Sequence, residues 1–273
     1  MQLGNSLRKI RKEQGLTQKE ICRGICAQSM LSAIENNQYI PNAELMIKLC
    51  SRLSISLNDF SLAANFNISA HKQFNNKVET LCNNHEYSKL KNFLLASSTI
   101  KQVETADQIQ AYYYYLGVSQ FHTDNNLDES QKNLLMSINS AETKNSLSTL
   151  SRLGLISLAV LKAKYGQQHS AHTLTVRAMK NVAVAPYEEN LNVVFYLAAF
   201  TMYILADERA ALSQINSAID YITKHDSHYM LANCYHLIAQ IAKDQGANER
   251  ELEAIQRQKF LTELFHEKID DNF

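Results

Sequence analysis

The first 60 residues place apolar side chains at the spacing of short helices. Leu3, Leu7 and Ile10 recur on one face of the first predicted helix. Thr17 followed three residues later by Glu20 is the capping-box pattern that opens a second helix. The predicted helices of this segment cover residues 3–14, run from Thr17 to a bend at 24–26, and cover residues 28–35, 43–53 and 57–60.

The rest of the chain also has helical periodicity, which returns at His71 after a short polar connector. Asn pairs, Gly and Pro interrupt it at short intervals, so the helices are predicted to form hairpins with short connections. The predicted helices cover residues 71–84, 86–97, 104–122, 127–143, 146–165, 169–182, 187–205, 208–224, 227–245 and 249–267. The predicted domains are therefore 1–62 and 71–273, joined by a linker at 63–70.

A weak internal repeat of about 40 residues runs through these hairpins. The first helix of each hairpin carries a bulky residue followed by a small one, and the second helix carries alanine where close packing is needed. The positions concerned are Tyr113, Leu150, Tyr196 and Tyr235 in first helices, and Ala141, Ala178, Ala218 and Ala254 in second helices. The pattern resembles degenerate tetratricopeptide repeats, which stack into a right-handed superhelical solenoid. The predicted fold class is all-α.

The opening segment resembles the lambda-repressor-like (Xre-type) helix-turn-helix. The resemblance rests on LTQKEIC, ICAQSMLSAIENN, Pro41, LMIKLCSRL and SISLNDF. It implies that the helix over 28–35 enters the major groove and that Gln18 braces a phosphate or base. Gln28 is the best candidate for direct readout, because glutamine pairs bidentately with adenine. The predicted DNA-binding residues are Arg11, Gln18, Lys19, Gln28, Ser29, Met30, Ser32 and Asn37.

Two positions depart from the family pattern, and the charge balance gives modest support for DNA binding. The family usually has a basic residue at Ala33 and glycine at Asn37. Residues 1–60 hold eight basic and five acidic residues, a net charge of +3, whereas the whole chain has 27 of each. A positive head suits contact with phosphates. The alternative is a helical bundle that keeps the fold without binding DNA.

The combination of an Xre-type domain with tetratricopeptide-like hairpins resembles the peptide-pheromone-responsive regulators of Gram-positive bacteria, the Rgg/PlcR/PrgX group, and is nearest to the PlcR type. HKQFNNKVETLCNNHEYSKLKNFL adds to this resemblance. It implies a quorum-sensing homodimer that binds a pseudo-palindromic DNA site and a short oligopeptide. The candidate peptide-binding residues, expected on the inner face of the repeats, are Tyr112, Tyr115, Gln120, Arg152, Asn192, Tyr196, Tyr203, Asn233 and His236.

These peptide contacts compete with a simpler interpretation, in which each tyrosine packs between helices. The run 112–115 cannot all face the groove, because four consecutive helical positions cover the whole circumference. In the PlcR-type pattern an inner-face Asn falls at Leu197. Asn and Tyr nevertheless suit a peptide, because asparagine can donate and accept and tyrosine has a polar tip.

Other functions find little support in the residues. Five scattered cysteines indicate buried thiols rather than a redox switch, and the nine histidines form no ligand set, so neither a metal nor a cofactor is predicted. No phosphate loop, nucleophile elbow or carboxylate pair suggests an enzyme. No apolar run is long enough to cross a membrane, so a cytoplasmic protein is expected. The alternative function is a tetratricopeptide scaffold that binds a protein partner.

Overall fold

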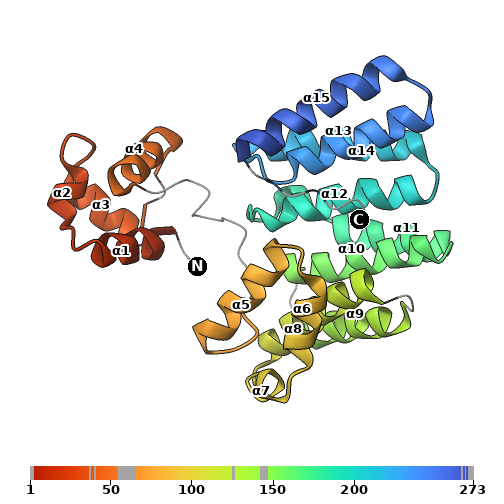
Figure 1. Cartoon of the computed structure of the whole chain (residues 1–273), viewed down its shortest axis with the longest axis horizontal. Coiled ribbons are helices and arrows are strands. Elements are labelled where there is room, and N and C mark those ends of the chain that lie inside the picture. Colours follow the sequence, from red (N-terminus) through yellow and green to blue (C-terminus); the bar gives the residue numbers. More distant parts are fainter. Residues whose placement is uncertain are drawn as a thin grey trace. The chain divides into compact units, whose positions relative to one another are not determined.

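The computed structural model describes residues 3–36, 38–39, 41–54, 66–124, 127–141, 147–265, 267 and 269. Throughout these residues the regular structure is helical, so the predicted all-α class is confirmed (Figure 1). The chain divides into two compact units, residues 1–64 and residues 65–273. Each unit has its own hydrophobic core.

The first unit is a small bundle whose helices agree closely with the prediction. They are α1 (Leu3–Glu13), α2 (Gln18–Cys22), α3 (Gln28–Glu35) and α4 (Ala43–Leu53). Thr17 and Glu20 form the predicted capping box at the start of α2. Leu7, Ile21 and Leu49 are among the fully buried residues that hold the bundle together. The helix predicted over 57–60 lies outside the described residues.

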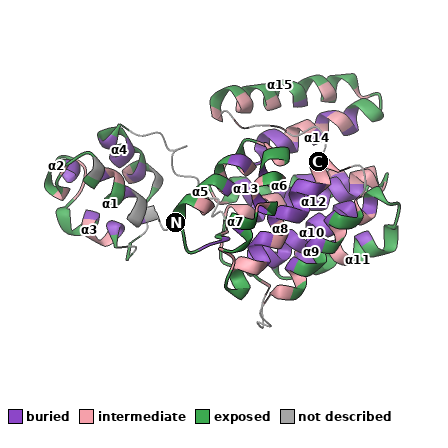
Figure 2. Ribbon diagram, turned by 60° about the horizontal axis from the view of Figure 1, so that its bottom comes forward, coloured by how far each residue is buried: buried purple, intermediate pink, exposed green. Residues whose placement is uncertain are grey.

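The second unit is a series of helices that pack mainly in consecutive pairs. They are α5 (Lys72–Asn83), α6 (Tyr87–Leu95), α7 (Ser97–Ile100), α8 (Ala106–Thr123), α9 (Asp128–Ser140), α10 (Thr149–Lys164), α11 (Gln168–Met179), η2 (Val182–Val184), α12 (Asn190–Ile204), α13 (Glu208–Lys224), α14 (Leu231–Asp244) and α15 (Asn248–Phe265). The closest pairs are α8 with α9, α10 with α11, α12 with α13 and α14 with α15. Figure 2 shows that α10 and α12 are buried almost throughout, so they form the centre of this unit.

Close approach between paired helices depends on glycine. A Cβ added at Gly117 of α8 would lie 2.9 Å from Leu134 Cγ and 3.1 Å from the Leu134 backbone nitrogen of α9. Gly154 of α10 approaches Ile138 of α9 in the same way, at 3.1 Å from Cγ1. Any larger residue at Gly117 would force α8 and α9 apart.

Several predicted boundaries differ from the structure. The helix predicted over 86–97 ends at Leu95, and α7 follows as a separate turn after Ala96 adopts an extended backbone. The helix predicted over 227–245 starts only at Leu231, because Met230 has a left-handed backbone with φ of 75°. Residues 227–230 therefore form a loop. No helix within the described ranges is long and apolar enough to span a membrane.

Candidate nucleic-acid interface and inner polar sites

The first turn of α3 presents polar side chains on the surface of the first unit. Gln28, Ser29 and Met30 are exposed, whereas Leu31 and Ile34 of the same helix are buried in the core. Ser32 is half-buried. This division is what a helix that reads a DNA groove requires, because one face must pack while the other remains open.

A chain of hydrogen bonds leads from the core to Gln28. The Arg11 guanidinium donates to both carboxylate oxygens of Glu35, with Nε–Oε1 at 2.6 Å and Nη2–Oε2 at 2.9 Å. Gln18 Nε2 also donates to Glu35 Oε2 at 2.9 Å, which fixes the orientation of the Gln18 amide. Its oxygen then accepts a weak 3.5 Å bond from Gln28 Nε2. This series of hydrogen bonds therefore aligns Gln28, the side chain expected to read a base.

Arg11 was predicted to contact DNA, and the structure places its side chain inside the bundle. Its side chain is buried and donates to Glu35 and to the carbonyl oxygen of Leu16. The hydrogen bond to Glu35 raises the pKa of Arg11. Burial by itself would raise the pKa of Glu35, but the hydrogen bonds from Arg11 and Gln18 outweigh burial and lower it. Arg11 and Glu35 therefore form a charged internal brace rather than a contact surface.

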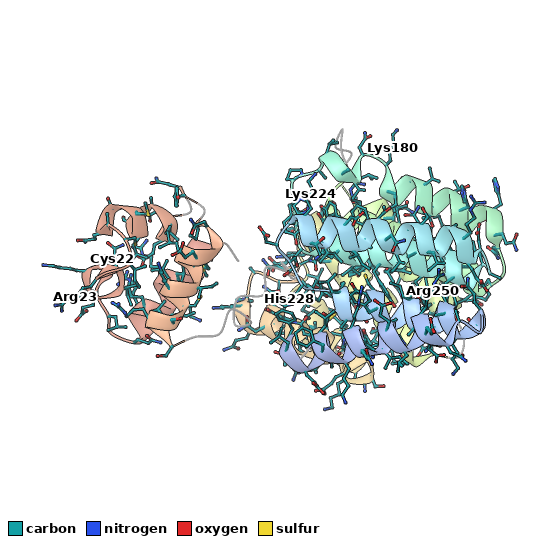
Figure 3. The ribbon with its side chains drawn as sticks, turned by 90° about the horizontal axis from the view of Figure 1, so that it is seen from above. Cys22, Arg23, Lys180, Lys224, His228 and Arg250 are labelled. Carbon is teal, nitrogen blue, oxygen red and sulfur yellow. The ribbon has the colours of Figure 1, made fainter. Side chains whose placement is uncertain are left out.

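The remaining predicted DNA contacts are placed differently. Lys19 is exposed on α2, and Gln18 is half-buried between α2 and α3. Asn37 lies outside the described residues. In Figure 3, Arg23 marks the bend that follows α2, where its side chain is exposed, while the neighbouring Cys22 is buried.

Arg52 was missed by the sequence analysis although it positions the turn between α2 and α3. Its Nη1 donates to Glu20 O and its Nη2 to Arg23 O, both at 2.9 Å. These are carbonyls at the end of α2, where the helix leaves its last acceptors unpaired. The sequence signal that could have predicted this role is the presence of a basic residue in the last turn of α4.

The predicted peptide-binding residues are mostly buried, contrary to the expectation of an open inner face. Only Tyr203 and His236 are half-buried, with Tyr203 bound to Asp244 and His236 to Gln258. The buried members are Tyr112, Tyr115, Gln120, Arg152, Asn192, Tyr196 and Asn233.

Several of these side chains serve the core. Tyr112 donates its hydroxyl to Leu94 O at 3.2 Å, and the hydroxyl of Tyr115 accepts from the Phe66 amide at 3.0 Å. Gln120 Oε1 accepts from Asn133 Nδ2 at 2.6 Å. For these residues the simpler interpretation, packing between helices, describes the structure.

Arg152 and Asn192 differ because each keeps a buried polar atom that has no hydrogen-bond partner within the part of the chain that the structure describes. Arg152 Nη1 donates to the carbonyls of Ala178 and Lys180 at the end of α11, but its Nε has no acceptor. Asn192 Nδ2 donates to Ser227 Oγ and Tyr229 O, both at 3.1 Å, while its Oδ1 is unpaired.

The hydroxyl of Tyr221 on α13 is a third buried atom without a partner in this part of the unit. Burial raises the pKa of Tyr221 to about 12, with Tyr187 adding to the effect and Arg152 opposing it. Tyr187 also lies within hydrogen-bond reach of Asn192, at 3.4 Å. Buried polar groups usually have a hydrogen-bond partner, so three such atoms in one region make it a candidate place for a ligand to bind. Neither Tyr221 nor Tyr187 has a recognisable signal in the sequence, because the two residues come from elements far apart in the chain.

Comparisons with known proteins agree with both units. The family model for helix-turn-helix domains matches residues 7–60. No curated protein matches by sequence. The structure of Bacillus thuringiensis PlcR in complex with the peptide PapR7 and DNA is similar with a TM-score of 0.61 and 21% identity, covering 97% of this chain and 95% of that one.

Two further structures are similar over most of their length. PlcR in its apo form has a TM-score of 0.57 and 18% identity, covering 97% of this chain and 94% of that one. ComR from S. thermophilus in complex with DNA and its signalling peptide ComS has a TM-score of 0.50 and 13% identity, with the same coverage. The chain thus contains a segment that matches the helix-turn-helix family model and has, over nearly its whole length, the fold of PlcR.

Proposed function

We propose that this protein is a sequence-specific DNA-binding transcription regulator whose activity is switched by a short signalling peptide bound in its second unit. The observation that carries the proposal is the exposed start of α3, aligned by the Arg11–Glu35–Gln18 chain inside a segment that matches the helix-turn-helix family. The fold shared with PlcR, solved with the peptide PapR7 and DNA, supports the peptide switch.

At the DNA, α3 lies in the major groove. Gln28 pairs with an adenine, and Ser29 and Met30 contact the neighbouring bases or their methyl groups. Lys19, exposed on α2, contacts a phosphate. Arg11 and Glu35 contribute by holding Gln18 rather than by touching DNA.

In the second unit, the peptide binds around Arg152 and Asn192. Their unpaired Nε and Oδ1 atoms offer one donor and one acceptor, which is what a peptide group requires. Entry requires local opening, because both side chains are buried. A peptide that binds only the open form therefore shifts the population between two conformations.

The protein acts as a cytoplasmic homodimer on a pseudo-palindromic site, with residues 1–62 binding DNA, 63–70 linking the domains and 71–273 providing the sensor and dimer contacts. A two-fold dimer of helix-turn-helix domains reads half-sites separated by whole turns of DNA.

The test uses a DNA site selected from a random pool by the unmodified protein. Gln28→Ala is expected to weaken binding to that site by about 1–3 kcal/mol while leaving binding to random DNA nearly unchanged. Gln73→Ala, an exposed glutamine on α5, is the matched control and should change neither. Equal binding of selected and random DNA by the unmodified protein would contradict the proposal and favour a scaffold that binds a protein partner.

A further inference from the structure

The loop 227–230 lies between two sets of contacts. On one side, Asn192 of α12 donates to Ser227 Oγ and Tyr229 O. On the other side, Phe265 at the end of α15 and Glu267 just beyond this helix contact the loop. The Phe265 ring stacks on His228 with centroids 3.7 Å apart and planes 2° from parallel. Figure 3 labels His228 at this loop.

Glu267 completes this second set by inserting its carboxyl group at the start of α14. Its Oε1 accepts from the Met230 amide at 2.8 Å and from Asn233 Nδ2 at 2.7 Å. The Asn233 side chain is buried, with 6% of the residue exposed. Two donors therefore converge on a single oxygen of Glu267.

The other oxygen of Glu267 is poorly accommodated. Its Oε2 atom is buried and has no hydrogen-bond partner among the described residues, although an ionised carboxylate can accept at both oxygens. Glu189 is a second carboxylate facing the same group. The site thus supplies what one carbonyl oxygen needs and does not supply what a charged carboxylate needs.

The ionisation of Glu267 agrees with this geometry. Burial raises the pKa of Glu267 to about 7, against the hydrogen bonds from Asn233, Met230 and Ala232, and Glu189 adds to the rise. The other titratable groups nearby are His228, Tyr229 and Cys234. Burial lowers the pKa of His228 and raises those of Tyr229 and Cys234, which favours the neutral form of each.

We propose that the start of α14 is a binding site for a neutral carbonyl oxygen, such as that of a peptide bond or an amide side chain, and that Glu267 fills it as a replaceable internal occupant. A neutral amide makes the same hydrogen bonds without burying a charge. The proposal rests on the proposed function where it identifies the incoming group with the switching peptide. Such a peptide, bound at Asn192, lies next to the loop that Glu267 contacts and competes with Glu267 for the same donors.

The first test replaces the occupant in the full chain. Glu267→Ala leaves buried donors unpaired, so it should lower the Tm by about 2–8 °C. Acetamide at about pH 8 should recover part of that loss, and sodium acetate should recover less, because acetate is ionised. Glu263→Ala removes an exposed carboxylate near the end of α15; it is the control and should show no selective response to acetamide. Equal effects of acetamide on both variants would overturn the proposal.

The second test uses Glu267→Gln and does not depend on the alanine variant folding. A group whose pKa is raised in the folded state stabilises the fold below its ordinary pKa, near 4.5, and loses that contribution as pH rises through about 7. The unmodified protein should therefore lose Tm relative to Glu267→Gln between about pH 5 and about pH 8. A parallel pH dependence of the two Tm values would also overturn the proposal. Neither test involves DNA or a signalling peptide, so its failure is distinct from failure of the proposed function.

Discussion

At the scale of single residues, the first unit depends on one buried ion pair. Arg11 and Glu35 come from α1 and α3, and their side chains are only 11% and 2% exposed. A buried pair contributes less to stability than its attraction suggests, but removing one partner is costly because the other charge is left buried. Glu35 also accepts from Gln18, so the same carboxylate contributes to stability and aligns a side chain of the surface proposed to read DNA.

We predict that Glu35→Gln destabilises the first unit by about 2–4 kcal/mol, because the Arg11 charge loses its partner. The pKa of Glu35 is lowered in the fold, so its contribution is present above about 4.5 and is lost as pH falls through the folded value. The variant should lack this loss on acidification. Amide exchange of α1 and α3 in the full chain measures both effects. Glu44→Gln, an exposed carboxylate paired with Lys48, is the control and should leave exchange unchanged.

Single residues were also where the sequence was least informative. The apolar spacing predicted that Gln28 and Ser29 of α3 would be exposed, because burying Leu31 and Ile34 turns the opposite face of the helix toward solvent. It did not predict that Arg11 would be buried, because its partner lies 24 residues away. Long-range pairing leaves no periodic trace in a sequence.

At the scale of elements, the helix pairs of the second unit are held by small residues at their contacts. Gly117 of α8 brings the backbone of α9 within contact distance at Leu134. Close packing of this kind leaves little room for added volume, because protein interiors are as dense as organic crystals.

We expect Gly117→Ala to destabilise the chain by about 1–3 kcal/mol even though alanine is the better helix former by about 1 kcal/mol. The reason is the clash with Leu134, part of which is with the rigid backbone. Gly154→Ala should cost less, since only the Ile138 side chain has to move. Thermal melts of both variants provide the comparison, and a higher Tm for Gly117→Ala would show that α8 and α9 have room to separate.

The ends of helices were predicted well where local sequence signals determine them. They were predicted poorly where tertiary contacts determine them. Thr17 and Glu20 fixed the start of α2 by a capping box that is visible in four residues. The predicted start of α14 was too early, because no neighbouring residue in the sequence indicates that Met230 adopts a left-handed backbone. The hydrogen bond from its amide goes to Glu267, 37 residues further along the chain.

At the scale of the whole molecule, charge is divided between the two units. The first 60 residues are net positive within a chain that is neutral overall. This division suits the proposed DNA binding through the first unit, and binding of that kind weakens as salt rises because it releases condensed cations from the phosphates.

We predict that Lys19→Gln lowers the slope of log affinity against log salt by about one unit, as expected for the loss of one phosphate contact. Lys224→Gln, an exposed lysine at the end of α13, removes the same charge from the second unit and should leave the slope unchanged. Filter binding at a series of salt concentrations measures the slopes. If both variants change the slope alike, the effect comes from net charge rather than from contact.

Arg52 gives the first unit an unexpected mechanical property. It sits in the last turn of α4, and its guanidinium holds the carbonyls of Glu20 and Arg23. Tension applied to the chain beyond α4 therefore reaches the bend before α3 through a single side chain as well as through the core. A force that tilted α4 would therefore also pull on the bend that precedes α3, through contacts that include none of the residues proposed to touch DNA.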